Sequence, residues 1–178
     1  MALTLLRHTT PAIASGVCYG MTDLDVADTF AAEARDVVAA LPPPDRIATS
    51  PLKRCRLLAE HIGEAMNLPV TMDERLREMD FGAWEGLPWS DIPRAELDQW
   101  ATDFLHARPH GGESVAMLTA RVRAALAEWQ TSESHALIVT HAGVIKAALA
   151  KEATSQGYNT NIGFGHFITL REDFLHDH

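Results

Sequence analysis

Two histidines each stand directly after a short apolar run: His8, which Arg7 precedes, and His141. Four to eight apolar residues bounded by polar or turn residues are typical of a buried strand. An open α/β sheet binds its ligands at the carboxyl ends of such strands. There a histidine can act as a base, a metal ligand or a nucleophile, and arginine suits anions because its donors form a planar fork. The alternative is that these side chains are solvated charges at strand ends.

The elements that must position these residues are strands alternating with helices. Apolar runs predict strands at 3–6, 46–49, 70–72, 136–140 and 163–170. Helices with one apolar face are predicted at about 26–41, 50–66, 111–130 and 144–151. Asp25 and Ser50 are the predicted N-caps of the first two helices. This alternation in a chain of 178 residues predicts a single domain over 1–178, an α/β three-layer sandwich with a mainly parallel sheet and helices on both faces.

The stretch 74–112 has a different character. It is rich in turn formers and holds three of the four tryptophans, Trp84, Trp89 and Trp100. We expect a long connection with one or two short helices that covers the active-site end of the sheet, because long loops in compact domains are often functional. Its tryptophans either stack on a nucleoside-like base or pin the connection to the domain. His106 and His110 are interpreted as surface residues rather than a metal pair, because no third ligand is evident.

The basic residues are expected to converge. In a mainly parallel sheet the carboxyl ends of the strands share one edge, so His8 and His141 can meet there. Arg7 and Arg54 would reach the same edge, and together the four side chains would form a pocket for a dianion such as a phosphoryl group. Phosphoryl transfer also needs a proton for the leaving oxygen. The connection offers three carboxylic acids for that role, Glu78, Asp80 and Glu85.

Five short blocks, in this order between residues 5 and 143, make the chain resemble the histidine phosphatase superfamily, the group of phosphoglycerate mutases and related phosphatases. The blocks are Leu6-Arg7-His8-Thr9, Ser50-Pro51-Leu52-Lys53-Arg54, Glu78-Met79-Asp80-Phe81-Gly82-Ala83-Trp84-Glu85-Gly86, Gly112-Glu113-Ser114 and Val139-Thr140-His141-Ala142-Gly143. Each block alone is a weak signal, whereas five in family order are highly specific. The resemblance implies a phosphoglycerate mutase-like fold.

The resemblance also implies roles for particular residues. His8 would become phosphorylated, and Arg7, Arg54 and His141 would line the phosphate pocket. Glu78 would be the general acid and then the base that activates water. The expected enzyme is a phosphomonoesterase that uses neither a metal nor a cofactor.

Within the superfamily, the Arg-His-Thr sequence and the loop Gly16-Val17-Cys18-Tyr19-Gly20-Met21-Thr22-Asp23 resemble the α-ribazole phosphatase branch. That resemblance implies removal of the 5′-phosphate of α-ribazole phosphate in cobalamin biosynthesis. The alternatives are a broad-specificity phosphatase for sugar or nucleotide monoesters and a non-catalytic phosphoester-binding module. A phosphoglycerate mutase ranks lower, because a short chain has few loops to retain the phosphorylated intermediate.

Two positions depart from the family pattern. Thr9 replaces a glycine, which makes the backbone there less permissive, and Ala14 stands where many members have an asparagine. We therefore expect that phosphate contacts in this loop come instead from Thr9, Thr10 or the backbone near Tyr19 and Gly20. The resemblance also implies that the N–H of Ala142 adds a donor. Glu113 either supports the site or interacts with the dipole of its helix.

The composition narrows the remaining options. A net charge of −9 disfavours nucleic acid as a partner. Cys18 and Cys55 form no CxxC pair and suggest no disulfide. No signal peptide and no apolar run long enough for a membrane span are evident, so we expect a cytoplasmic protein whose partner is a small phosphorylated substrate. The sequence leaves the oligomeric state open, with a homodimer as one option, and offers no interpretation of 151–163.

Overall fold

Five strands form one mixed sheet in the computed structural model, which describes residues 2–130 and 133–171. The strands are β1 (Ala2–Arg7), β2 (Arg46–Thr49), β3 (Val70–Met72), β4 (His135–Thr140) and β5 (Phe167–Arg171), in the spatial order β3-β2-β4-β1-β5. All neighbouring pairs are parallel except β1 and β5, which are antiparallel. The prediction of a mainly parallel sheet is thus confirmed. The end of the chain, residues 172–178 with His176 and His178, lies outside the described residues.

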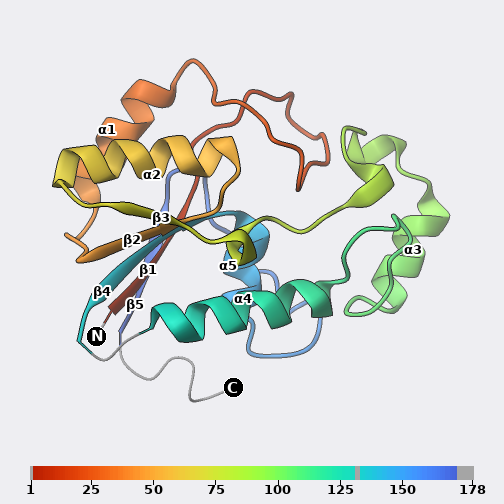
Figure 1. Ribbon diagram of the computed structural model, residues 1–178. Helices are drawn as coiled ribbons and strands as arrows, with labels where there is room; N and C mark the ends of the chain where they lie inside the picture. Colours follow the sequence, from red (N-terminus) through yellow and green to blue (C-terminus); the bar gives the residue numbers. More distant parts are fainter. Residues whose placement is uncertain (1, 131–132, 172–178) are drawn as a thin grey trace.

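Helices cover both faces of this sheet (Figure 1). The helices α1 (Phe30–Ala40) and α2 (Lys53–Met66) pack on one face, and α4 (Val115–Trp129) and α5 (Ala142–Leu149) pack on the other. Side chains alternate between the two faces along a strand. Leu6, Leu137 and Val139 accordingly face α1 and α2, whereas Leu5 and Ile138 face α4 and α5. The predicted three-layer sandwich is confirmed. None of the helices in the described residues is long and apolar enough to cross a membrane.

The start of α1 differs from the prediction. The helix begins at Phe30 rather than at about Val26, and Asp25 is not its N-cap. The carboxylate of Asp25 accepts a hydrogen bond from the N–H of Val26 and pairs with Lys53 at 3.0 Å. Its charge therefore ties the loop after β1 to the start of α2, and that loop extends about four residues further than the apolar pattern indicated.

The helix α4 begins at Val115, with Ser114 as its N-cap, rather than at about 111. Three other boundaries differ at the carboxyl edge of the sheet. The helix α2 begins at Lys53, and Ser50 instead directs its hydroxyl at His141. The helix α5 begins directly after His141, two residues earlier than predicted. The strand β5 begins at Phe167, so residues 163–166 belong to the loop before it. In each case residues at the sheet edge take part in the candidate site described below.

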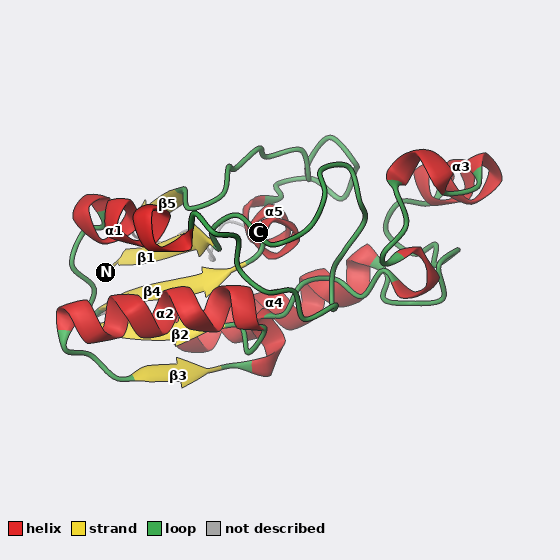
Figure 2. Ribbon diagram, turned by 90° about the horizontal axis from the view of Figure 1, so that it is seen from above, coloured by secondary structure: helices red, strands yellow, loops and turns green. Residues whose placement is uncertain are grey.

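The connection from 74 to 112 contains three short 3₁₀ helices (Glu74–Leu76, Gly82–Trp84 and Trp89–Asp91) and α3 (Arg94–Thr102), which is more than the one or two short helices predicted. Figures 1 and 2 both show α3 beyond the carboxyl edge of the sheet, at the far end of the molecule from the N-terminus. Trp84 is buried against Trp100, with ring centroids 5.5 Å apart. The packing interpretation therefore holds for Trp84, whereas Trp89 stays 37% exposed.

His110 corrects the prediction of two surface histidines. Its side chain is only 3% exposed, and its ring meets that of Trp84 edge to face at 4.9 Å. Its Nδ1 accepts a hydrogen bond from the N–H of Gly112, so the ring holds the turn that precedes α4. His106 is exposed, as predicted.

Candidate active site

The register of the two central strands brings the two histidines together. Arg7 on β1 lies opposite Thr140 on β4, and the N–H of His8 donates to the carbonyl of Thr140 at 3.0 Å. The next residue on each strand is a histidine, so His8 and His141 leave the sheet at the same level. Their ring centroids are 5.3 Å apart, and both rings are buried.

The hydrogen bonding of His8 decides which ring nitrogen is available. Its Nδ1 lies 2.7 Å from the carbonyl oxygen of Thr9, and a carbonyl oxygen only accepts, so Nδ1 carries the hydrogen. The lone pair of the neutral ring is therefore on Nε2. Burial, together with Arg54 and Arg7, lowers the pKa of His8 to about 3. At neutral pH the ring is uncharged, as a nucleophile must be.

His141 has a hydroxyl and a thiol as neighbours. Its Nε2 lies 2.8 Å from Ser50 Oγ and 3.4 Å from Cys55 Sγ. Burial lowers the pKa of His141 well below its usual value, and the positive charge of Arg54 acts in the same direction. Sequence reasoning assigned Ser50 only a capping role. The signal for a second role was its position directly after β2, at the same sheet edge as the histidines.

Arg54 is held by the loop that resembles the α-ribazole phosphatase branch. Its Nη1 and Nη2 donate to the carbonyls of Thr22 and Gly20, each at 2.6 Å. Glu85 accepts from the N–H groups of Gly20 and Thr22 at 3.1 and 2.8 Å, so it fixes this loop in turn. The Tyr19 ring centroid lies 5.2 Å from the Arg54 guanidinium carbon. Arg54 Nε is buried without a partner in the described part of the chain, so this donor is not used by the protein itself.

Arg7 is covered by the segment before β5. Its Nη1 donates to the carbonyl of Ile162 at 2.7 Å, and its guanidinium carbon lies 4.0 Å from the ring centroid of Phe164. That ring is also 5.7 Å from the ring of His8. The sequence did not single out Phe164, because the predicted strand 163–170 included it and aromatic residues are common in strands.

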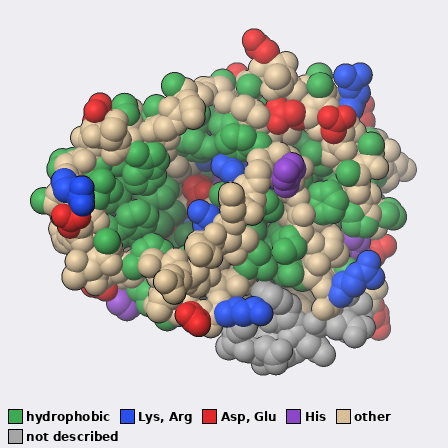
Figure 3. Space-filling model, turned by 180° about the vertical axis from the view of Figure 1, so that it is seen from behind, with side chains coloured by type: hydrophobic (Ala, Val, Ile, Leu, Met, Phe, Trp, Pro, Cys, Tyr) green, Lys and Arg blue, Asp and Glu red, His purple; other side chains and the backbone are tan. Residues whose placement is uncertain are grey.

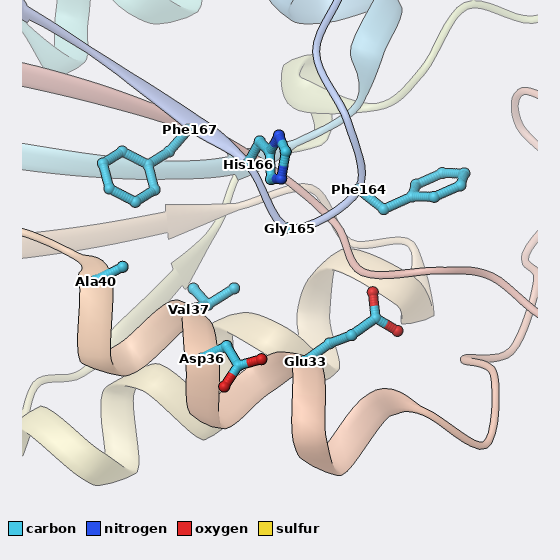
Figure 4. Close-up of a pocket in the computed structure, with 8 residues that line it drawn as sticks. All are labelled: Glu33, Asp36, Val37, Ala40, Phe164, Gly165, His166 and Phe167. Atoms are coloured by element: carbon cyan, nitrogen blue, oxygen red, sulfur yellow. The ribbon is translucent and has the colours of Figure 1, made fainter.

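Phe164 also borders a cavity of about 430 Å³ that lies between α1 and the segment 164–167. Figure 4 shows Glu33 and Asp36 on its α1 side, and Gly165 and His166 on the other. Glu33 Oε1 accepts from both the N–H and the hydroxyl of Thr10, at 3.1 and 2.9 Å. The donors of Thr10, predicted to contact phosphate, therefore face Glu33.

Glu78 is the carboxylic acid that reaches the start of α5, the helix that begins directly after His141. Its Oε2 accepts from the N–H of Gly143 at 3.0 Å, in the first turn of α5, and its Oε1 accepts from the N–H of Met79 at 2.8 Å. A Cβ at Gly143 would overlap Glu78 Oε1, so a glycine is required for this approach. Ala142, whose N–H is another candidate donor, is the first residue of the same helix. The space-filling view shows a hollow on one face of the molecule where basic and acidic side chains lie close together (Figure 3).

The other two candidate acids hold backbone instead. Asp80 accepts from the N–H of Gly82 at 2.8 Å, and both oxygens of Glu85 accept from N–H groups of the loops around it. Of the three acids that the sequence left open, only Glu78 is at the first turn of α5.

The two departures from the family pattern are accommodated locally. Thr9 is buried, and of the non-glycine residues that the structure describes only Asn67 has a positive φ. The backbone at Thr9 therefore needs no glycine. Thr9 Oγ1 is buried without a partner within the described ranges, and Ala14 is exposed in the loop after β1.

Comparison with known proteins supports the family resemblance that the motifs carry. The model of the histidine phosphatase superfamily (branch 1) matches residues 3–160. An adenosylcobalamin/alpha-ribazole phosphatase of Salmonella typhimurium is 29% identical over 162 residues, covering 86% of this chain and 80% of the relative. A glucosyl-3-phosphoglycerate phosphatase of Mycobacterium tuberculosis is 37% identical over 118 residues, covering 58% of this chain and 52% of the relative. The chain thus spans about half the length of that relative.

Solved structures have the same architecture. A mycobacterial glucosyl-3-phosphoglycerate phosphatase in complex with VO3 matches with a TM-score of 0.82 and 31% identity, over 96% of this chain and 92% of that one. A phosphoserine phosphatase of Entamoeba histolytica reaches a TM-score of 0.87 at 21% identity, over 99% of this chain and 92% of that one, which is a likeness of fold. Since the family model covers most of the described residues, the chain belongs to the histidine phosphatase superfamily, branch 1.

Proposed function

We propose that the protein is a phosphomonoesterase that acts through a phosphohistidine on His8. In the first step Nε2 of His8 attacks phosphorus, the bond from phosphorus to the ester oxygen breaks, and that oxygen takes a proton from Glu78. In the second step Glu78 takes a proton from water, the water oxygen attacks phosphorus, and the phosphorus–nitrogen bond breaks. Inorganic phosphate leaves and His8 returns to its neutral form.

The main support for this proposal is the tautomer of His8 and the neutral charge of its ring. The bond from Nδ1 to the Thr9 carbonyl leaves the lone pair on Nε2, while burial keeps the ring neutral. Arg7, Arg54 and His141 surround that ring with donors that can stabilise the charge on the phosphoryl oxygens. Glu78, at the first turn of α5, supplies the proton and later removes one.

For the substrate we propose α-ribazole 5′-phosphate. The Salmonella relative named for that activity aligns with 86% of the chain, and the loop with Tyr19 and Gly20 directly holds Arg54. Phe164, which is 37% exposed beside Arg7 and His8, offers an aromatic face to a base-like leaving group.

A second candidate substrate is glucosyl-3-phosphoglycerate. The relative from Mycobacterium tuberculosis is more identical over its aligned part than the Salmonella protein, and the mycobacterial structure aligns over 96% of the chain. This candidate differs from the first in two chemical respects, because its leaving group carries a carboxylate and has no aromatic ring.

The test is release of inorganic phosphate from a panel of monoesters in the presence of a chelator. The panel holds α-ribazole phosphate, glucosyl-3-phosphoglycerate, 3-phosphoglycerate, nucleoside monophosphates and p-nitrophenyl phosphate. We expect turnover, with the highest kcat/KM for α-ribazole phosphate. A preference for glucosyl-3-phosphoglycerate would replace the first substrate with the second, and similar weak rates on all esters would indicate a broad-specificity phosphatase. Binding of phosphate without turnover of any ester would refute the enzyme itself.

A further inference from the structure

Arg121 on α4 makes an unusual set of contacts close to Glu78. Its Nε and Nη2 donate to the two oxygens of Glu113 at 2.7 and 2.8 Å. Its Nη1 donates to the carbonyls of Arg75 and Arg77 at 2.8 and 2.6 Å, and Nη2 also donates to the carbonyl of Glu78 at 3.0 Å. A guanidinium has five N–H groups, and these five bonds use all of them.

Three of these five acceptors are main-chain carbonyls of one short segment. The segment 75–78 leaves a 3₁₀ helix at Leu76 and has no strand or helix of its own beyond that point. No ladder of backbone hydrogen bonds therefore fixes the main chain at Glu78. The hydrogen bonds from Arg121, with one from the Thr140 hydroxyl to the carbonyl of Leu76 at 2.7 Å, take the place of such a ladder.

Glu113 holds this arrangement from the other side. Its side chain is 14% exposed and that of Arg121 is 22% exposed, so the pair is largely screened from solvent. The backbone N–H of Glu113 also donates to the carbonyl of Asp80 at 2.8 Å. One residue thus orients the guanidinium and ties the chain two residues beyond Glu78, which a carboxylate that only interacts with a helix dipole would not do.

Arg121 also lies close enough to the histidine pair for its charge to act on His141. It makes no contact with the groups that would touch the ester, because all its donors are occupied by Glu113 and the main chain. Its hydrogen bonds can therefore influence the reaction only through the segment that carries Glu78, whereas its charge also acts on His141. The variant Arg121→Lys, which keeps the charge, separates these two effects.

We infer that Arg121, oriented by Glu113, is a positioning residue that places the Glu78 carboxylate at the first turn of α5 for proton transfer. This inference rests on the proposed function, in which Glu78 protonates the leaving oxygen. It predicts that the loss of Arg121 impairs esters that need a proton on the leaving group and spares those that do not.

The experiment compares kcat/KM for an alkyl monoester with kcat/KM for p-nitrophenyl phosphate, whose leaving group departs without help. kcat/KM reports the phosphorylation step, so hydrolysis of the phosphoenzyme does not mask the difference. For Arg121→Gln we expect a loss of about 10- to 100-fold on the alkyl ester, since small misplacements of a reacting group have effects of this size. On p-nitrophenyl phosphate the loss should be below about threefold. The matched control is Arg123→Gln on the same helix, which should change neither value.

Combination with Glu78→Gln separates this inference from the proposed function. If Arg121 acts through Glu78, the double variant should be no slower on the alkyl ester than Glu78→Gln alone. Equal losses on both esters, or losses that add in the double variant, would overturn the positioning role. Unchanged alkyl-ester activity in Glu78→Gln itself would instead refute the proposed role of Glu78.

Two further variants guard against a loss that reflects only unfolding. Glu113→Gln keeps the shape of the side chain that orients Arg121, and it should lower kcat/KM on the alkyl ester selectively while thermal unfolding remains cooperative. Arg121→Lys keeps the charge but lacks the fork of donors, so it should fail to restore the alkyl-ester activity. Full activity in both variants would show that the geometry of the guanidinium is irrelevant to Glu78.

Discussion

The candidate site joins two regions that are held in different ways. His8 and His141 are fixed by the parallel ladder between β1 and β4, in which each residue is placed by its neighbours on both strands. Glu78 belongs to the connection 74–112, where bonds from side chains to the main chain replace the ladder. The proposed nucleophile therefore depends mainly on the backbone ladder of the sheet, whereas the proposed acid depends on side chains that are distant in the sequence.

The largest expected loss of activity comes from a variant at the strand ends, where His8 and His141 lie. His8→Ala removes the nucleophile, so kcat should fall by about 10³-fold or more, the scale seen when a nucleophile is deleted. The backbone bond from His8 to Thr140 remains, and thermal unfolding should stay cooperative. His106→Ala, an exposed histidine of the connection, is the matched control and should keep full activity. Substantial residual turnover in the His8 variant would move the nucleophile elsewhere.

The next effect tests the point where the two regions meet. Gly143→Ala places a Cβ where Glu78 Oε1 now lies, so the carboxylate must move. We expect kcat/KM for an alkyl monoester to fall by about 10²-fold, because proton transfer needs close geometry. In a Glu78→Gln background the same change should cost less than about twofold, since no acid remains to be displaced. A full loss in that background would show that Gly143 acts independently of Glu78.

The pH dependence of the unfolding free energy tests whether the ring of His8 is buried in its neutral form. The pKa of His8 is about 3 when folded and near 6.5 when unfolded, so below pH 6.5 the unfolded chain binds the proton first. Stability should therefore be complete above pH 6.5 and decline as pH falls toward 3, by about 2 kcal/mol from His8 between pH 7 and pH 5. His141 acts in the same direction. The free energy of unfolding in urea should fall by about 2 kcal/mol less in His8→Asn than in the parent between pH 7 and pH 5. If the two proteins lost the same stability as the pH falls, the ring of His8 would not be buried in its neutral form.

The smallest expected effect is on phosphate binding, through the contact of Glu85 with the loop that holds Arg54. Glu85→Gln keeps an accepting oxygen but removes the charge that binds the N–H groups of Gly20 and Thr22. We expect the inhibition constant of inorganic phosphate to rise about three- to tenfold, the range of a weakened hydrogen bond to a charged group. Both ester types should slow alike, in contrast to the Arg121 variants. Selective loss on alkyl esters would place Glu85 with the acid instead.

Much of the strand-end region was predictable from the sequence. Apolar runs locate β1 and β4, and the rule that ligands bind at the carboxyl ends of parallel strands brings His8 and His141 together. The helix boundaries near the site were not predictable in the same way. Ser50 and Asp25 are residue types that often cap helices. In the structure each side chain contacts a partner far away in the sequence, since Ser50 contacts His141 and Asp25 contacts Lys53.

The connection was harder to interpret because it has no period. Three acids, Glu78, Asp80 and Glu85, lie within one motif, and only their long-range contacts distinguish them. Arg121 did leave a signal, since it lies between Leu118 and Ala125 on the buried face of α4. A charged residue on such a face needs partners, but the sequence does not say which. Phe164 left no signal at all.

The direction of β5 sets the order in which the site can be completed during synthesis. Because β5 runs antiparallel to β1, its beginning lies at the same edge as the end of β1. The carbonyls of Ile162 and His166, and the N–H of Gly165, therefore close onto Arg7 and His8, which leave the ribosome first. Arg7 has to wait for Ile162, 155 positions later in the sequence, so a nascent chain cannot complete the candidate site until residues 162–166 have emerged.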